Sequence, residues 1–442
     1  MTTLRPANLR LMTRNVQSVS KGSENLHKSY YTWKLLTLSS RQIMIKSLGC
    51  LTLLAVLLGG CEISVDGNTV RGSGKIATEQ RTVAEFNAIE NSSFFDVVVT
   101  NGPQAPIVIS GDDNLVPEIE TVVENKVLII RSKRKSYHFT WSSQPGTVRI
   151  TTTALSKATN SGSGDMDIHD LQSEKLTLNL NGSGDVRVTG KLGMLKLVSS
   201  GSGDLDMQQL QVAQAELEMR GSGEVHLDTV SQSLDTTSNG SGDLRVDNLQ
   251  AASVKLIKHG SGDVRLLGNI KTLQLETVGS GDIDIQGIKT EQANVRASGS
   301  GDIRLAGEVG ELTLTTSGSG DLDAENLKIK DLHIANTGPS NQSFRGIQGI
   351  LKAEMSGSGD LDAELQSDAA LELNMQGPGQ ANLRGKAKSL TAKVSGSGDL
   401  RASELLLDSA SIKVTGPGEA EVNVKKAGGS RVVKIDRNGV AS

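Results

Sequence analysis

The chain is organised around a short motif, Ser-Gly-Ser-Gly-Asp, which first appears complete at residues 161–165 and recurs, intact or altered, almost to the C-terminus. Successive copies lie alternately twenty and nineteen positions apart, so two copies make one 39-residue unit of duplication. A constant period of about 20 residues is typical of a solenoid, whose repeats bury their apolar faces only against their neighbours. The first glycines of the copies are Gly162, Gly182, Gly201, Gly221, Gly240, Gly260, Gly279, Gly299, Gly318, Gly338, Gly357, Gly377, Gly396 and Gly416.

Each repeat contains two short segments in which apolar and polar residues alternate. In one repeat the pattern places Leu205, Met207, Leu217 and Met219 on one face and charged residues on the other. Alternation with period two is the pattern of a half-buried β-strand. The sequence therefore predicts an all-β fold, a parallel β-solenoid of about 14 coils of 19–20 residues over residues 155–424, with an irregular β cap before it.

Charged residues favour one repeat per coil over two. A short coil that holds one repeat places Asp167 beside Arg187 and Arg187 beside Asp206, whereas a 39-residue coil would stack acid on acid. A 39-residue coil would also be too wide for aliphatic side chains to fill. Arg245 and Arg265 are exceptions, because the short coil places these two arginines side by side.

Three roles compete for the glycine motif. The one we favour is a corner, where glycine supplies unusual backbone angles, stacking leaves no room for a Cβ, and the aspartate accepts nearby backbone N–H groups in an Asx-type turn. Calcium binding is the second, although Glu224, Gln380 and Glu419 replace the aspartate in some copies. Phosphate binding is the weakest, because no Gly-Lys-Ser/Thr follows. The calcium alternative involves Asp165, Asp185, Asp204, Asp243, Asp263 and Asp282.

The N-terminus resembles a bacterial lipoprotein signal. Lys46 precedes an apolar run at residues 51–58, and Leu58-Gly59-Gly60-Cys61 matches the lipobox. The run is far shorter than the roughly 20 residues that span a bilayer. The resemblance implies that residues 1–60 are a leader, with Met44 as a possible true start, and that Cys61 carries the lipid within an anchor and linker at 61–71. Glu62 after the cysteine implies sorting to the outer membrane of a Gram-negative bacterium.

In residues 72–154 the spacing of apolar runs and turn residues differs from that of the repeats. This segment predicts the N-terminal cap, which includes a hairpin around Asn125. A cap is expected because an open solenoid end exposes unpaired strand edges. One stretch combines basic and aromatic residues. It is either a solvated hairpin tip or a contact surface for a glycan, a lipid head group or an envelope protein. Its members are Arg131, Lys133, Arg134, Lys135, Tyr137, Phe139 and Trp141.

Charge and composition narrow the possible partners. Without residues 1–60 the chain has 38 basic and 49 acidic residues, a net charge of −11, which argues against nucleic acid as a partner. No cysteine or histidine cluster indicates a metal or a cofactor. Residues 425–442 read as a C-terminal cap, in which two lysines and two glycines blunt the last strand edge.

Several segments together resemble the bacterial head GIN domain family, often labelled "putative autotransporter adhesin". They are Gly72-Ser73-Gly74, Phe86-Asn87-Ala88-Ile89, Phe95-Asp96-Val97-Val98-Val99, Gly111-Asp112-Asp113-Asn114-Leu115 and the Ser-Gly-Ser-Gly-Asp copies. The resemblance implies a right-handed β-helix exported to the cell envelope, without established catalytic residues. The chain departs from the family pattern at Pro378, at Pro417 and at residues 338–341.

These observations favour a lipid-anchored envelope protein that acts as a non-catalytic binding, adhesion or structural module. The alternatives are a polysaccharide-degrading β-helix enzyme and a calcium-dependent adhesin. Against the enzyme, Phe344 is the only aromatic residue in the repeat array, and the histidines fall in no shared motif.

Overall fold

The structure is a computed structural model that describes residues 69–134, 138–142, 144–366, 368–426, 429–436 and 439–441. The leader and Cys61 therefore lie outside the described residues. Residues 67–442 form one compact unit. In the described part of the chain all long elements are β-strands, and the single helix is the short 3-10 helix η1 (Val116–Glu118). No helix in this part is long and apolar enough to cross a membrane.

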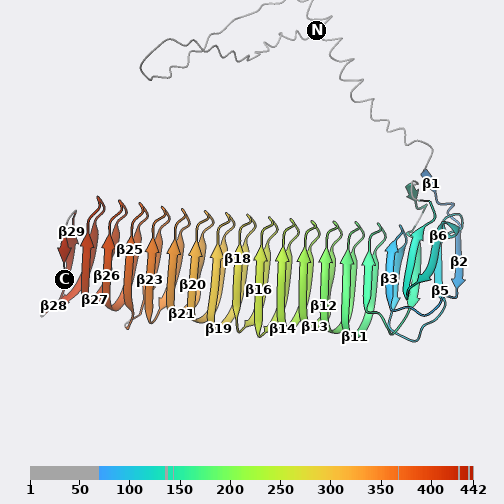
Figure 1. The fold of residues 1–442 in the computed structure, drawn as a ribbon, viewed down its shortest axis with the longest axis horizontal. Helices are drawn as coiled ribbons and strands as arrows, with labels where there is room; N and C mark the ends of the chain where they lie inside the picture. Colours follow the sequence, from blue (N-terminus) through green and yellow to red (C-terminus); the bar gives the residue numbers. More distant parts are fainter. Residues whose placement is uncertain are drawn as a thin grey trace, which may run out of the picture. The chain divides into compact units, whose positions relative to one another are not determined.

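Strands β10 to β28 form the predicted β-solenoid, with about 13 turns instead of the expected 14 or so, and they stack in one long row (Figure 1). Most coils are one bent strand, and others are two shorter strands. The strands are β10 (Lys157–Asn160), β11 (Met166–Leu180), β12 (Val186–Ser199), β13 (Leu205–Met219), β14 (Val225–Ser238), β15 (Leu244–Ala251), β16 (Ser253–Lys258), β17 (Val264–Ile270), β18 (Leu273–Thr277), β19 (Ile283–Ala297), β20 (Ile303–Thr316), β21 (Leu322–Asn336), β22 (Gln342–Ile347), β23 (Ile350–Met355), β24 (Leu361–Leu365), β25 (Ala370–Met375), β26 (Ala381–Val394), β27 (Leu400–Val414) and β28 (Ala420–Lys426).

The strand register confirms one repeat per coil. Asp167 lies opposite Arg187, and Arg187 lies opposite Asp206, in parallel pairs. Arg187 and Asp206 also form an ion pair, with Nε and Oδ2 2.9 Å apart. Arg245 and Arg265 lie side by side, as the short coil required. Acid and base therefore face each other at this position across about half of the neighbouring coils.

The core is a column of aliphatic side chains that points inward from every coil. Leu205, Met207, Leu217 and Met219 are all at most 2% exposed, so the alternation predicts the buried face correctly. Phe344, which is also buried, lies between two small residues of the neighbouring coils, Ala324 and Ala363.

The motif is a tight corner, and the reason for glycine there is close stacking. A Cβ on Gly182 would lie 2.0 Å from the carbonyl oxygen of Gly162 in the preceding coil. The other part of the expectation, that motif glycines need unusual backbone angles, is wrong, because the motif glycines are not among the described residues with left-handed φ. Left-handed glycines recur instead at a second bend. Five are spaced by whole 39-residue units, Gly190, Gly268, Gly307, Gly346 and Gly385, and Gly287 lies in the coil between two of them.

Shorter strands form the N-terminal cap at one end of the row (Figure 1). β3 and β4 pair in parallel with the first coils, whereas β2 with β5 and β6 with β7 are antiparallel. The β6–β7 turn contains Asn125 at φ 51°, which confirms the expected hairpin. The cap strands are β1 (Thr69–Arg71), β2 (Ile76–Arg81), β3 (Ala88–Ser92), β4 (Asp96–Thr100), β5 (Ile107–Asp112), β6 (Ile119–Glu124), β7 (Val127–Ser132), β8 (His138–Thr140) and β9 (Thr147–Thr151).

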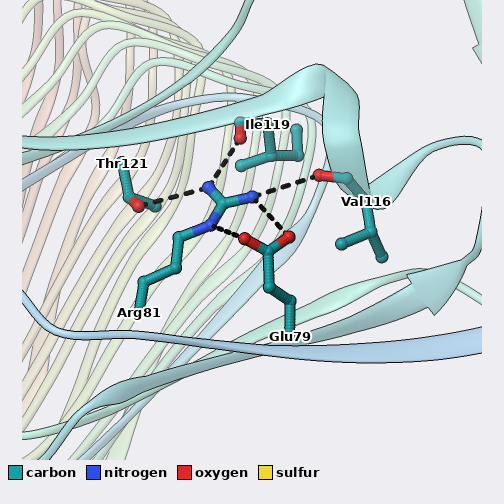
Figure 2. A network of polar contacts seen from close by, with 5 residues as sticks. All are labelled: Glu79, Arg81, Val116, Ile119 and Thr121. Atoms are coloured by element: carbon teal, nitrogen blue, oxygen red, sulfur yellow. Dashed lines mark hydrogen bonds and ion pairs between the residues drawn. The ribbon is translucent and has the colours of Figure 1, made fainter.

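Arg81 ties the cap together at its outer edge (Figure 2). Its Nη1 donates to the carbonyl oxygen of Ile119 at 2.7 Å and to Oγ1 of Thr121 at 3.2 Å, and its Nη2 donates to the carbonyl oxygen of Val116 at 3.4 Å. Glu79 accepts two further bonds from the guanidinium, at 2.9 and 3.0 Å, and these bonds lower the pKa of its carboxyl group. The guanidinium thus links β2 to β6. It also donates hydrogen bonds to backbone carbonyl groups at the end of the solenoid.

The chain reverses at the other end of the solenoid. β29 (Gly429–Ile435) pairs antiparallel with β28, and β30 (Val440–Ala441) pairs antiparallel with β27. Lys425 reinforces this end through an ion pair of 2.5 Å between its Nζ and Oδ1 of Asp408. The reversal ends the parallel stack.

Candidate functional site

An open groove of about 1310 Å³ lies where the cap meets the first coils. Cap residues in or next to β3, β7 and β8 form its wall, and stacked serine-glycine corners form its floor. The wall contains Ser92, Ser93, Phe94, Arg131, Arg134, His138 and Phe139, and the floor contains residues 161–163, 181–183, 200–202 and 220–222. We call this hollow the cap groove.

An aromatic cluster supports the wall of the cap groove. The rings of Phe94 and Phe139 are stacked, with centroids 4.2 Å apart and planes at 4°. Behind them, Trp141 packs against Phe94 at 5.1 Å and edge-on against the fully buried Phe95 at 4.8 Å. Each such aromatic pair stabilises a fold by about 0.5–1.5 kcal/mol beyond the contribution of its buried area. The cluster therefore stabilises the wall of the groove.

The residues predicted as a basic and aromatic patch separate in the structure. Arg131, Arg134 and Phe139 line the cap groove, whereas Trp141 lies behind the lining. Lys133 is not among the lining residues; its backbone N–H donates to the carbonyl oxygen of Glu118 at 2.8 Å. The other two members, Lys135 and Tyr137, lie outside the described residues. The sequence did not predict Phe94 as a residue of the site. A signal was present, because side chains of adjacent residues in extended backbone point to opposite faces, so one of two adjacent phenylalanines must face away from the core.

Acidic partners compensate the arginines of the groove. Nε of Arg131 lies 2.6 Å from Oε2 of Glu120, and Nη2 of Arg134 lies 3.1 Å from Oε1 of Glu118. The bond to Glu120 raises the pKa of the Arg131 guanidinium. The third lining arginine, Arg220, forms an ion pair with Glu218. The groove is therefore polar, with its positive charge matched by carboxylates.

Two rows of polar side chains run along the floor. The second motif serines are exposed in each coil, and their hydroxyl groups form no hydrogen bond to another described residue: Ser163, Ser183, Ser202 and Ser222. The other row, one residue before the first motif glycine, consists of Ser161, Asn181, Ser200 and Arg220. Neighbouring members of a row are separated by one strand spacing, roughly 4.8 Å.

The motif aspartates, which the calcium alternative involved, form a ladder of hydrogen bonds between coils. Oδ1 of Asp165 accepts the backbone N–H of Asp185 at 2.9 Å, and Oδ1 of Asp185 accepts that of Asp204 at 2.8 Å. The expected acceptor role is confirmed, but the donor belongs to the next coil instead of the same turn. The same contact joins Asp243 to Asp263, Asp263 to Asp282 and Asp282 to Asp302.

These contacts give the aspartates a structural role. One carboxylate oxygen of each is committed to a backbone donor, as in any N–H-capped carboxylate. Among the residues that the structure describes, no group of three or more histidine, cysteine, aspartate or glutamate side chains is arranged to hold a metal ion.

Lys258 is a buried charge that the sequence did not reveal. Its side chain is fully buried between Ser238 and Thr277 of the neighbouring coils. Its Nζ donates to the carbonyl oxygens of Gly260 at 3.2 Å and Gly281 at 2.7 Å. Burial lowers the pKa of the amine, and the carboxylate of Asp263 is the main opposing influence.

A family described as "Putative auto-transporter adhesin, head GIN domain" matches the chain in four overlapping segments, residues 85–246, 189–269, 267–361 and 343–433. Together these segments cover most of the chain. The protein belongs to the head GIN domain family. This confirms the resemblance inferred from the glycine motif and the cap segments.

Solved structures similar to this head GIN domain protein have little sequence in common with it. A putative adhesin from Parabacteroides merdae is 17% identical, with 72% of this chain and 100% of that chain covered and a TM-score of 0.28. A putative adhesin from Bacteroides fragilis is 17% identical (75% and 99%, TM-score 0.21), and a putative lipid binding protein from Parabacteroides distasonis is 16% identical (75% and 98%, TM-score 0.22). Similarity of this size says nothing about a shared site. No curated protein matches the chain.

Proposed function

We propose that this head GIN domain protein is a non-catalytic adhesin of the cell envelope and that the cap groove is its binding site. The observation that carries the proposal is the groove itself, an open surface of about 1310 Å³ with an aromatic wall and a hydroxyl-rich floor. Concave surfaces with aromatic residues and a few convergent polar groups are the usual places for ligands. The family description supports an adhesive role.

The chemistry of the groove suits a neutral glycan. Serine hydroxyls, the amide of Asn181 and backbone groups offer hydrogen bonds to sugar hydroxyls, while the edges of Phe94 and Phe139 offer apolar contact. The arginines are compensated by carboxylates, so they supply donors with little net charge. A ligand with many hydroxyl groups and no net charge matches this surface.

The lining argues against the polysaccharide-degrading alternative. Glycoside hydrolysis usually requires two carboxylates that flank the scissile bond. Among the described residues, Glu90 is the one carboxylate that lines the cap groove. This distribution fits binding better than bond cleavage.

We also propose that Cys61 anchors the protein to the outer membrane through lipid, as its lipobox suggests. Stable anchoring takes two lipid signals, which diacylglycerol and an acylated amine together provide. Seven residues, 62–68, separate Cys61 from β1, a reach of at most roughly 25 Å when extended. β1 pairs with β8, which contains Phe139 of the groove wall. The proposed tether therefore keeps the cap groove close to the membrane and its own envelope.

The anchor is tested by replacing Cys61. Cys61→Ala should abolish fatty-acid labelling and release the protein from membranes, whereas Cys50→Ala should leave both unchanged. Labelling and membrane association are measured by metabolic labelling and fractionation. Labelling that persists in Cys61→Ala would rule out this anchor.

The groove is tested by filling its floor. All strands of the described residues lie after residue 68, so a chain of residues 62–442 contains the whole described fold. Ser202→Trp in this chain should reduce binding to purified envelopes at least tenfold. Ser319→Trp is the matched control, because Ser319 is the equivalent exposed serine three duplication units later and lies outside the groove. Equal binding by both variants and the unaltered chain would refute the proposed site.

A further inference from the structure

The first four coils of the cap-groove floor show a repeat of two coils. In the row that precedes the first motif glycine, a short hydroxyl side chain alternates with a longer hydrogen-bonding one: Ser161, Asn181, Ser200 and Arg220. Ser161 and Ser200 are one duplication unit apart, as are Asn181 and Arg220. Equivalent side chains along the groove are thus separated by two strand spacings, roughly 9.6 Å.

We infer that the ligand of the cap groove is an extended, neutral glycan with a two-sugar repeat, which lies along the solenoid axis. This inference rests on the proposed function and narrows it. In an extended chain of β-1,4-linked sugars, alternate rings are turned over, so equivalent groups recur once per disaccharide. A disaccharide is about as long as two coils of the solenoid, so successive repeats of the polymer meet equivalent side chains.

Each part of the groove has a defined contact in this arrangement. The amide of Asn181 and the guanidinium of Arg220 face every second sugar, and both are long enough to donate to its hydroxyl or acetamido groups. The serine hydroxyls contact the sugars between them. The floor reaches from Ser161 to Ser241, four coil steps or roughly 19 Å, which holds about two disaccharides.

The surroundings select against acidic polymers. The exposed carboxylates of Asp165, Asp185 and Asp204 form a row two residues beyond the serine row. At a separation of a few ångströms, like charges near a protein surface repel by a few kcal/mol. Because the arginines of the groove are already paired, they do not offset this repulsion. A polymer of neutral sugars avoids this cost.

The inference is tested with defined oligosaccharides and the chain of residues 62–442. Isothermal titration measures the affinity for β-1,4-linked N-acetylglucosamine oligomers of two to six sugars, with α-1,4-linked glucose oligomers for comparison. Affinity should rise in steps of two sugars up to four and then level off, and the α-linked oligomers should bind at least tenfold more weakly.

A double variant and a control variant test whether the two-sugar repeat of the ligand matches the two-coil repeat of the floor. Asn181→Ser with Arg220→Ser should weaken binding of the four-sugar oligomer at least tenfold. Gln376→Ser, in the same row five duplication units after Asn181, should not change it. Both replaced side chains are exposed, so the fold should survive, and thermal melting of the variants verifies this.

The outcomes separate the two proposals. Three results would overturn the two-sugar repeat of the ligand. They are equal affinity for α- and β-linked oligomers, an affinity that does not depend on the number of sugars, and unchanged binding by the double variant. If Ser202→Trp still abolished envelope binding in that case, the proposed groove would stand. If Ser202→Trp bound envelopes normally, the groove and the register would both be wrong.

Discussion

Oδ1 of Asp185 accepts the backbone N–H of Asp204, one coil further along the chain, at 2.8 Å. The relationship recurs at most corners and sets like charges one strand spacing apart, an arrangement that repels unless the carboxylates are held by donors. The ladder breaks where the side chain is longer. Among the described residues, the N–H of Asp243 makes no such bond to Glu224, although the N–H of Glu224 does bond to Asp204 at 2.8 Å. The ladder thus requires the length of an aspartate or asparagine side chain.

Asparagine should replace aspartate in this ladder without loss, and alanine should not. Asp302→Ala leaves the N–H of Asp321 without its acceptor and should cost about 1 kcal/mol of unfolding free energy. Asp302→Asn keeps the oxygen and removes a repelling charge, as Asn341 does naturally with the N–H of Asp360 at 3.0 Å. Hydrogen exchange of the Asp321 amide and urea unfolding distinguish the two variants. Equal destabilisation by both would show that the bond is unimportant.

Corner glycines should tolerate no side chain. A Cβ on Gly201 would lie 2.0 Å from the carbonyl oxygen of Gly182, and a backbone atom within a stack cannot move aside easily. Gly201→Ala should therefore cost about 1–3 kcal/mol, in the range of overpacked cores. The neighbouring Ser202→Ala, at an exposed position, serves as the control in urea unfolding and should change little. A Gly201→Ala protein as stable as this control would contradict the packing argument.

Phe344 should depend on the small residues beside it. Ala363 lies opposite Phe344 in the next coil, so Ala363→Leu should overpack the core and cost about 1–3 kcal/mol. Phe344→Leu in the same chain should recover part of that loss by making room. A double-mutant cycle in urea measures the coupling. Additive effects would mean that the two side chains do not compete for space.

Lys258 should make the free energy of unfolding depend on pH in the alkaline range. Because burial holds its folded pKa below the unfolded value of about 10.4, the unfolded chain binds more protons between the two values. The free energy of unfolding should therefore rise with pH in that interval, and at lower pH the buried charge lowers stability. Lys258→Met should lose this slope. Urea unfolding at successive pH values from neutral to 10 checks it, and parallel profiles of the two proteins would refute it.

The repeat spacing and the opposition of Asp167 to Arg187 were enough to predict the solenoid and its register, because a stack of equal coils leaves few other arrangements. Contacts between segments that are distant in the sequence could not be predicted in this way. The pairing of Arg131 with Glu120 depends on the β6–β7 hairpin, and the burial of Lys258 depends on acceptors in two coils. The aspartates show the same limit: their chemistry indicated an acceptor, but an isolated motif suggested a donor in its own turn.

The cap at one end and the reversed strands β29 and β30 at the other are independent of the number of coils between them. Each coil contacts only the coils before and after it, so gain or loss of a 39-residue unit changes neither end. Each such event alters the reach of the molecule by roughly 9.6 Å. Unequal recombination within the repeats can therefore set the distance between the two ends in fixed steps, without any compensating change elsewhere in the protein.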